Sequence, residues 1–255
     1  FRAHRRPPAR NLTIFIADLP PDLEGLRIAH ITDLHVGSTI RRPFVSALVQ
    51  AVNALEADLI CFTGDLADGT VQDLEHEVAP LAQLSAPLGV WYCTGNHDYY
   101  WDAMAWMEKI PDLGLQLLSN SHGVVTRGAA RLIIGGLPDP AGAEALPGDP
   151  RHTADVAAVF AGAPEGHRLL LAHQPRAAVT ASQAGADLTL CGHTHGGQIL
   201  PWAVLVRLQQ PIVAGLRQRA GSKGCIYVSN GVGYWGPPMR FGAPSEIACL
   251  TLRTG

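Results

Sequence analysis

The chain has 255 residues, of which 47% are hydrophobic and 16% are charged, and its formal net charge is −3 at pH 7. This composition is typical of a globular protein with a substantial buried core, and it excludes a disordered chain. The slightly acidic balance argues against nucleic acid as a structural partner, because such binding relies on a broad basic surface.

The first ten residues, FRAHRRPPAR, are basic and contain proline, unlike a core segment. Two interpretations stand: a solvated tail, or a juxtamembrane linker whose arginines lie beside anionic lipid headgroups. No apolar run approaches the roughly 18 residues that a membrane span requires, so a tether would have to precede Phe1. We expect residues 1–10 to form a leader and residues 11–255 to form a single domain.

The first half of the chain alternates between strand and helix patterns. Residues 58–63 (DLICFT) form an almost continuous apolar run, which is typical of a strand buried on both faces. Residues 43–56 repeat apolar side chains at helical spacing after a proline near the start. The same reasoning predicts strands at residues 11–16, 26–32 and 89–94 and a second helix at residues 71–84. This βαβαβ rhythm implies parallel strands with right-handed crossovers.

The second half is predicted from shorter patterns. After a helix that contains Trp101, Trp106 and Met107, the segment at residues 138–150 has the composition of a loop. A helix is expected at residues 153–160, and another before residue 187. Strands are expected at residues 115–119, 123–127, 131–136, 168–172, 187–191, 224–229 and 246–252. Because no repeat or linker is evident, one two-sheet domain is the simplest partition.

The five cysteines are odd in number and lack C-x-x-C spacing. Each lies in an apolar run, so they are predicted to be reduced, buried hydrophobic side chains. Neither a disulfide framework nor a zinc knuckle is expected.

Polar clusters follow the predicted strands. The segment LCGHTHGGQ places His193 and His195 two residues apart, where side chains of an extended segment point the same way. By itself such a pair is also compatible with a polar loop. Four other strand ends carry potential ligands, however, and the carboxyl ends of parallel strands meet at one sheet edge. The complete candidate ligand set is Asp33, His35, Asp65, Asn96, His173, His193 and His195.

Seven nitrogen and oxygen ligands exceed the needs of one ion but suit two ions that share one carboxylate. Two divalent ions about 3.5–4 Å apart form a clamp for displacement at phosphorus. With no thiolate and four histidines, Mn, Fe, Zn and Co are the expected metals, and Mn is favoured. His97 remains as a candidate to protonate a leaving group or stabilise charge, and Asp68 is a candidate to orient it.

These motifs resemble the calcineurin-like metallophosphoesterase superfamily. The matching patterns are D-x-H at Asp33, G-D-x-x-D at Gly64, G-N-H-D at Gly95, a lone His173, and G-H-T-H at Gly192. The resemblance implies two mixed β-sheets packed face to face and flanked by helices, a four-layer α/β/β/α sandwich. It also implies direct attack by a metal-bridging hydroxide, without a phosphoenzyme.

The resemblance further assigns the ligands. It implies one metal held by Asp33, His35, Asp65 and His195, and another held by Asp65, Asn96, His173 and His193, with Asp65 bridging. The segments GHTHGGQILP and NGVGYWGPPMR are similar to bacterial membrane-tethered members. They therefore imply a membrane-associated full-length protein, with the cytoplasmic face favoured and this chain as its soluble domain.

Aromatic residues follow the G-N-H-D motif, and Trp235 lies in the glycine- and proline-rich segment near the C-terminus. Two interpretations stand: rings that pack against the core, or an apolar rim for a lipid-like or nucleobase-bearing substrate. Trp235 and Arg240 are therefore candidate substrate-binding residues, with Arg240 contacting phosphate.

Together these observations predict a hydrolase that cleaves a phosphomonoester, phosphodiester or pyrophosphate bond, on a lipid-linked or nucleotide substrate, using two divalent metals. One alternative is a metal-dependent scaffold or binding protein that uses the same fold without turnover. A second alternative is a soluble nucleotide phosphodiesterase that does not act at a membrane.

Overall fold

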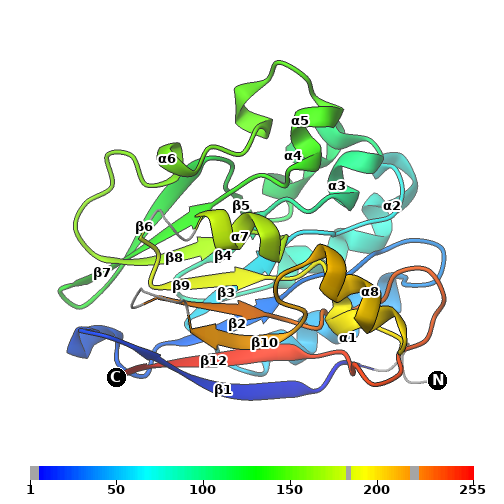
Figure 1. Ribbon diagram of the computed structural model, residues 1–255. Coiled ribbons are helices and arrows are strands. Elements are labelled where there is room, and N and C mark those ends of the chain that lie inside the picture. The colour runs from blue at the N-terminus through cyan, green and yellow to red at the C-terminus, as the bar shows by residue number, and fades with distance from the viewer. Residues whose placement is uncertain (1–5, 182–184, 219–223) are drawn as a thin grey trace.

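Two six-stranded β-sheets form the centre of the molecule in the computed structural model, which describes residues 6–181, 185–218 and 224–255 (Figure 1). The strands are β1 (Ala9–Ile16), β2 (Arg27–Ile31), β3 (Leu59–Thr63), β4 (Val90–Cys93), β5 (Gln116–Leu117), β6 (Ser121–Arg127), β7 (Ala130–Gly136), β8 (His167–Leu171), β9 (Leu188–Cys191), β10 (Gly215–Gln218), β11 (Cys225–Val228) and β12 (Ile247–Thr254). The α-helices are α1 (Arg42–Asn53), α2 (Val71–Val78), α3 (His97–Tyr100), α4 (Ala103–Asp112), α5 (Ala141–Ala145), α6 (Val156–Val159), α7 (Pro175–Ala181) and α8 (Trp202–Gln209).

Both sheets are mixed. The first has the order β1-β12-β2-β3-β4-β5, and within it only β12 and β2 are antiparallel. The second has the order β10-β11-β9-β8-β7-β6, with antiparallel pairs at its two edges. The predicted parallel arrangement of the strands at residues 26–32, 58–63 and 89–94 is confirmed, as is the two-sheet architecture.

Three hydrophobic cores fill the spaces between the layers of sheets and helices. One lies between the two sheets and includes Cys61 and Leu190, while a second packs the other face of the first sheet against α1, α2 and α4. The third packs the second sheet against α6 and α7. Strand β3 contributes Ile60 to the helix side and Cys61 to the inter-sheet side, which explains its continuous apolar run. All five cysteines are free and buried, as predicted.

Several element boundaries differ from the sequence prediction. Strand β1 begins at Ala9, because its parallel pairing with β12 extends there, and Arg10 forms an ion pair with Glu246. The last two residues of the predicted leader therefore belong to the sheet, and residues 1–5 lie outside the described part of the chain. The second predicted helix ends at Val78 and continues as a 3-10 turn that contains Pro80.

Three of the described α-helices were not predicted, and the first of them is the short α3, which begins at His97 inside the G-N-H-D motif. The expected loop at residues 138–150 contains the short helix α5, and α8 follows the G-H-T-H motif. Over the described residues, no helix is both long enough and apolar enough to cross a bilayer.

Candidate metal centre

The predicted ligands follow the carboxyl ends of five strands, on the side of the molecule where α3 and α8 lie (Figure 1). Asp33 and His35 follow β2, Asp65 follows β3, Asn96 follows β4, His173 follows β8, and His193 and His195 follow β9. All are buried except His193, which is partly exposed. The structure thus gathers every predicted ligand at the carboxyl ends of strands from both sheets, the position where open α/β sheets bind ligands.

The backbone at these strand ends is unusually strained. Of the nine non-glycine residues with positive φ in the described part of the chain, five are predicted ligands: Asp33, His35, Asp65, His193 and His195. Left-handed conformations are costly for such residues and concentrate at functional sites. Two glycines allow close approach here, since a Cβ on Gly95 would collide with the Asp65 carboxylate and one on Gly192 with Asp33 and Thr32.

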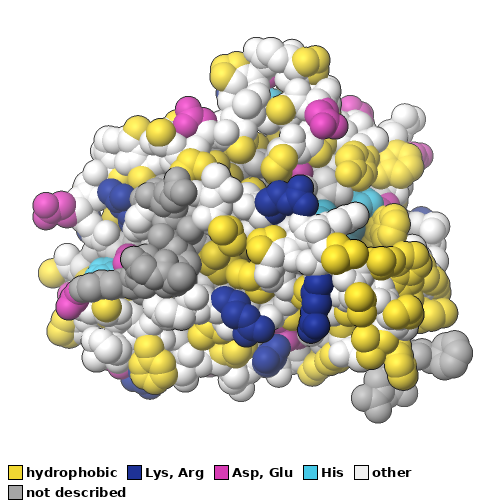
Figure 2. Space-filling view, in the orientation of Figure 1, with side chains coloured by type: hydrophobic (Ala, Val, Ile, Leu, Met, Phe, Trp, Pro, Cys, Tyr) yellow, Lys and Arg dark blue, Asp and Glu magenta, His cyan; other side chains and the backbone are white. Residues whose placement is uncertain are grey.

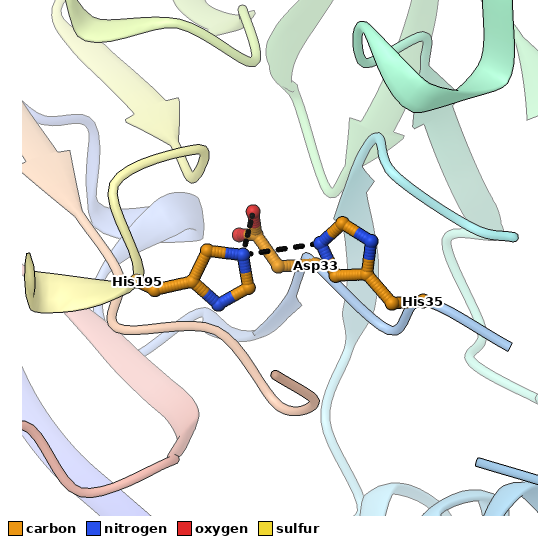
Figure 3. Close-up of side chains that lie close together, drawn as sticks. All are labelled: Asp33, His35 and His195. Carbon is orange, nitrogen blue, oxygen red and sulfur yellow. Dashed lines mark hydrogen bonds and ion pairs between the residues drawn. The ribbon is translucent and has the colours of Figure 1, made fainter. Parts of the chain in front are cut away.

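One group of side chains converges from β2 and β9 (Figure 3). The Nε2 atom of His195 lies 3.1 Å from Nε2 of His35 and 3.4 Å from Oδ1 of Asp33. His35 directs its other nitrogen, Nδ1, to Asp68 at 3.2 Å. An Nδ1–H that donates to Asp68 leaves the Nε2 lone pair facing His195.

A second group centres on Asp65. Its Oδ2 atom lies 3.1 Å from Nε2 of His173 and 3.6 Å from Nε2 of His35. The Nδ1–H of His173 donates to the Thr63 carbonyl at 2.6 Å, so the Nε2 lone pair of the neutral ring points at the carboxylate. With the ring neutral, that buried nitrogen has no hydrogen to donate to Asp65. Two facing acceptors require a cation between them, either a proton or a metal ion.

The charge balance of His173 supports this interpretation. Burial lowers the pKa of its imidazole, but the negative charge of Asp65 outweighs that effect, so the pKa lies well above its usual value. A proton on His173 therefore takes the position that a metal cation could hold. For His195, burial and the neighbouring His35 and Arg240 place the pKa well below its usual value, which keeps the ring neutral and able to ligate.

His193 and His195 have different neighbours. Nδ1 of His193 lies 2.9 Å from Oδ1 of Asn96, and its ring centroid lies 5.2 Å from that of His173. The backbone N–H of His193 donates to the Asp33 carboxylate at 2.9 Å. The side chain of His195 instead lies against His35 and Asp33, so the two histidines have separate neighbours, a geometry compatible with two separate ions.

His97 and Asp68 lie together at the edge of the site, as predicted. Nδ1 of His97 is 2.6 Å from Oδ1 of Asp68, and the His97 ring lies edge-on to His35 at 4.6 Å. Burial lowers the pKa of His97, but the hydrogen bond to Asp68 outweighs it, so the pKa lies above its usual value. Burial raises the pKa of Asp68, while hydrogen bonds from His35 and His97 bring it to about 2.

Arg240 does not lie where the sequence prediction placed it. Its guanidinium donates to the backbone carbonyls of His195, Asn230, Gly233 and Ala243 and also contacts Nδ1 of His195 at 3.1 Å. Because these acceptors occupy its N–H groups, we correct the prediction of a phosphate contact. Arg240 instead ties the C-terminal segment to His195.

The aromatic residues form two groups, one packed in the core and one exposed to solvent. Tyr99 and Trp106 are core residues, whereas Tyr100, Trp101 and Trp235 are exposed. The Trp235 ring lies 6.2 Å from that of His97, and its side chain lines a cavity of about 290 Å³ together with His193 and His195. Its position is therefore compatible with contact to a bound substrate.

Sequence reasoning missed Asp98, which organises the loops that carry the ligands. Its buried carboxylate accepts hydrogen bonds from the backbone N–H groups of Asp65, Leu66 and Gly95 and from the Tyr92 hydroxyl at 2.6–3.2 Å. The place of Asp98 at the end of the G-N-H-D motif was a sequence signal that could have indicated this role. The buried Asp139, which accepts from Gln174 beside His173, had no comparable signal in its loop-like sequence.

A family model described as calcineurin-like phosphoesterase matches residues 26–197, so the chain belongs to this family. A transmembrane protein with metallophosphoesterase domain from Danio rerio is 38% identical over 98% of this chain. An uncharacterized metallophosphoesterase from Campylobacter jejuni is 35% identical over 98% of the chain. The chain spans only 58% and 64% of the length of these two relatives.

Solved structures support the fold. The NAD nucleotidase of Haemophilus influenzae aligns over 84% of this chain and 54% of its own, with a TM-score of 0.57 and 17% identity. A dimetal phosphatase from Danio rerio aligns over 91% of this chain and 100% of its own, with a TM-score of 0.52 and 12% identity. Family membership and the ligand cluster support a metal-dependent phosphohydrolase domain.

Proposed function

We propose that this domain is a phosphoesterase that depends on two divalent metal ions. Asp33, His35, Asp65 and His195 hold one ion, and Asp65, Asn96, His173 and His193 hold the other. The observation that carries the proposal is the buried Nε2 of His173, 3.1 Å from the Asp65 carboxylate, where a proton or a metal cation is needed between the two groups. The same site brings Nε2 of His35 within 3.1 Å of Nε2 of His195, and Nδ1 of His193 within 2.9 Å of Oδ1 of Asn96, so further groups that can ligate a metal already lie next to one another.

When bound, divalent ions supply Lewis acidity toward a phosphoryl group and activate water as a nucleophile. The chain itself contributes the acid chemistry. The hydrogen bond to Asp68 favours the charged form of His97 and raises its pKa, and His97 lies at the partly exposed edge of the site. In this proposal the protonated His97 donates its proton to the leaving oxygen, while Asp68 holds the ring in place.

The bond cleaved is a phosphomonoester, phosphodiester or pyrophosphate, and Mn is the favoured metal among Mn, Fe, Zn and Co. Trp235 stands beside the site as a candidate contact for the apolar or aromatic part of the substrate. The relatives named as transmembrane proteins favour membrane attachment of a longer chain through an upstream segment. Over the described residues the chain contains no such span.

A combined metal and turnover measurement tests the proposal. Purified protein reconstituted with Mn²⁺ should contain two equivalents of metal and hydrolyse an aryl phosphodiester, an aryl phosphomonoester or a pyrophosphate. His193→Ala should lower metal content and turnover together. His76→Ala, an exposed histidine on α2, is the matched control and should change neither.

Two results would contradict this proposal. A single ion in fully active protein would exclude the dinuclear assignment. Two bound ions without turnover on all three bond types would favour the alternative of a metal-dependent scaffold.

A further inference from the structure

Helix α8 presents an apolar face to solvent. None of its eight residues is buried, and Trp202, Val204, Leu205 and Leu208 are each at least half exposed, with Leu208 at 79%. A helix of a water-soluble domain normally turns its apolar face inward. The helix therefore stabilises the fold little through its outer side, and its apolar face is available to a partner.

The exposed face continues into the C-terminal segment. The backbone N–H of Leu200 donates to the carbonyl of Phe241, and both side chains are exposed, Phe241 at 68%. Trp235 and Met239 extend the same surface, and Gln198 hydrogen-bonds the backbone of Trp235. Figure 2 shows hydrophobic side chains gathered over the side of the molecule where α8 lies. Contiguous apolar surface of this kind marks an interaction site.

Charge is segregated around this surface. Of the 22 aspartates and glutamates in the chain, none lies between Leu188 and Ser245, whereas five of the 19 lysines and arginines do. Arg207 and Arg217 line a cavity of about 560 Å³ together with Leu200 and Phe241. The cavity thus combines cationic and apolar walls, which suits a lipid phosphate and the acyl region next to it.

The same face leads to the candidate metal centre. A predominantly apolar cavity of about 290 Å³ is lined by Trp202, Val206 and Trp235 on one side and by His193 and His195 on the other. A surface that contacts α8 would therefore lie next to the cavity that leads to the metal ligands.

We propose that α8 and residues 231–243 dock on the surface of an anionic lipid bilayer. Trp202, Leu205, Leu208 and Phe241 enter the boundary between headgroups and acyl chains, and Arg207 and Arg217 contact lipid phosphates. Acidic lipid is favoured over an apolar protein partner because the surrounding segment has only basic charges, and tryptophan beside exposed leucine suits the membrane interface. Binding of this kind does not depend on the proposed hydrolysis, although it would select phosphoesters in lipid headgroups.

Co-sedimentation with vesicles tests the docking surface on the chain as it stands. The protein should bind vesicles of phosphatidylcholine and phosphatidylglycerol and bind pure phosphatidylcholine weakly. Leu208→Glu, and separately Arg207→Gln with Arg217→Gln, should each lower the partition coefficient roughly tenfold. Phe15→Glu is the matched control, since Phe15 is 64% exposed on the outer strand β1, and it should bind like the wild type.

Two measurements keep this inference separate from the proposed function. The Leu208→Glu variant should hydrolyse a water-soluble phosphoester at the wild-type rate, so a failure of hydrolysis alone leaves the binding result intact. Equal binding of anionic and neutral vesicles, or wild-type binding by both α8 variants, would overturn the inference. It would also be overturned if sedimentation detected a dimer that Leu208→Glu dissociates, because a second copy would then cover the face.

Discussion

The metal centre and the outer face of α8 both depart from the usual distribution of side chains. The first buries polar groups, and the second exposes apolar ones. At the strand ends, carboxylates and imidazoles are buried close to one another. On α8, leucine, valine and tryptophan face water. Crowded buried ionisable groups and exposed apolar groups are both costly, and both raise the free energy of the isolated chain.

The two regions therefore call for different partners. The strand ends need positive charge, which divalent ions supply, whereas α8 needs an apolar surface, which a bilayer supplies. Only the first region is held by a dense network, in which Asp98 and Arg240 hydrogen-bond the loops that carry the ligands. Five perturbations, in decreasing order of expected effect, test this contrast.

Asp65→Asn should have the largest effect, because Asp65 is the proposed bridging ligand between the two ions. Loss of several kcal/mol of Lewis-acid stabilisation predicts a decrease in kcat of about a thousandfold or more. Metal analysis should find fewer than two ions per chain. Wild-type activity with two bound ions would contradict the bridging role.

His97→Ala should lower kcat about a hundredfold or more, since a positioned general acid contributes on that scale. Metal content should stay at the wild-type value, which separates this residue from the ligands. The loss should be greatest on substrates with poor leaving groups, which depend most on protonation. A loss that is uniform across leaving groups would count against the acid role.

Arg240→Met should weaken metal binding about tenfold to a hundredfold, the usual cost of removing a group that orients a ligand. The guanidinium contacts both the carbonyl and Nδ1 of His195, so its removal should loosen that ring. Metal titration should show that one of the two ions is released first. Arg240→Lys should restore little of this, because a lysine cannot reproduce the forked contacts.

Asp68→Asn should change the pH dependence of activity. The carboxylate raises the pKa of His97, so without it the protonated form is lost at a lower pH. The alkaline limb of the kcat profile should therefore move toward lower pH, while the wild type retains activity further into the neutral range. An unmoved alkaline limb would show that another group governs it.

Leu208→Ala should have the smallest effect, with a change in the free energy of unfolding within about 0.5 kcal/mol. Leu48→Ala on α1, whose side chain is fully buried, should cost about 2–5 kcal/mol. Chemical denaturation of the two variants compares an exposed and a buried leucine on helices of the same domain. A large loss from Leu208→Ala would mean that α8 packs more closely than its exposure indicates.

Much of the fold followed from local patterns in the sequence. The apolar run of β3 and the helical spacing of α1 predicted a buried parallel strand and its crossover helix, and both are observed. The predicted ends of strands were less accurate where pairing with a distant strand sets the boundary. Strand β1 starts at Ala9 because β12, more than 200 residues away in the chain, pairs with it there.

The candidate ligands could be found from the sequence, because clusters of ligand-type residues directly follow apolar strand patterns. Their meeting at one centre also depends on the packing of two sheets, since β2, β3 and β4 belong to the first sheet and β8 and β9 to the second. The contacts of Arg240 and the exposure of α8 could not be predicted in this way, because both depend on packing between distant segments. An arginine between Met239 and Phe241 has no local signal that its N–H groups are taken by backbone carbonyls from distant loops. Likewise, the apolar residues at 202–208 look like core in sequence, and only the packing of the other elements leaves them outside it.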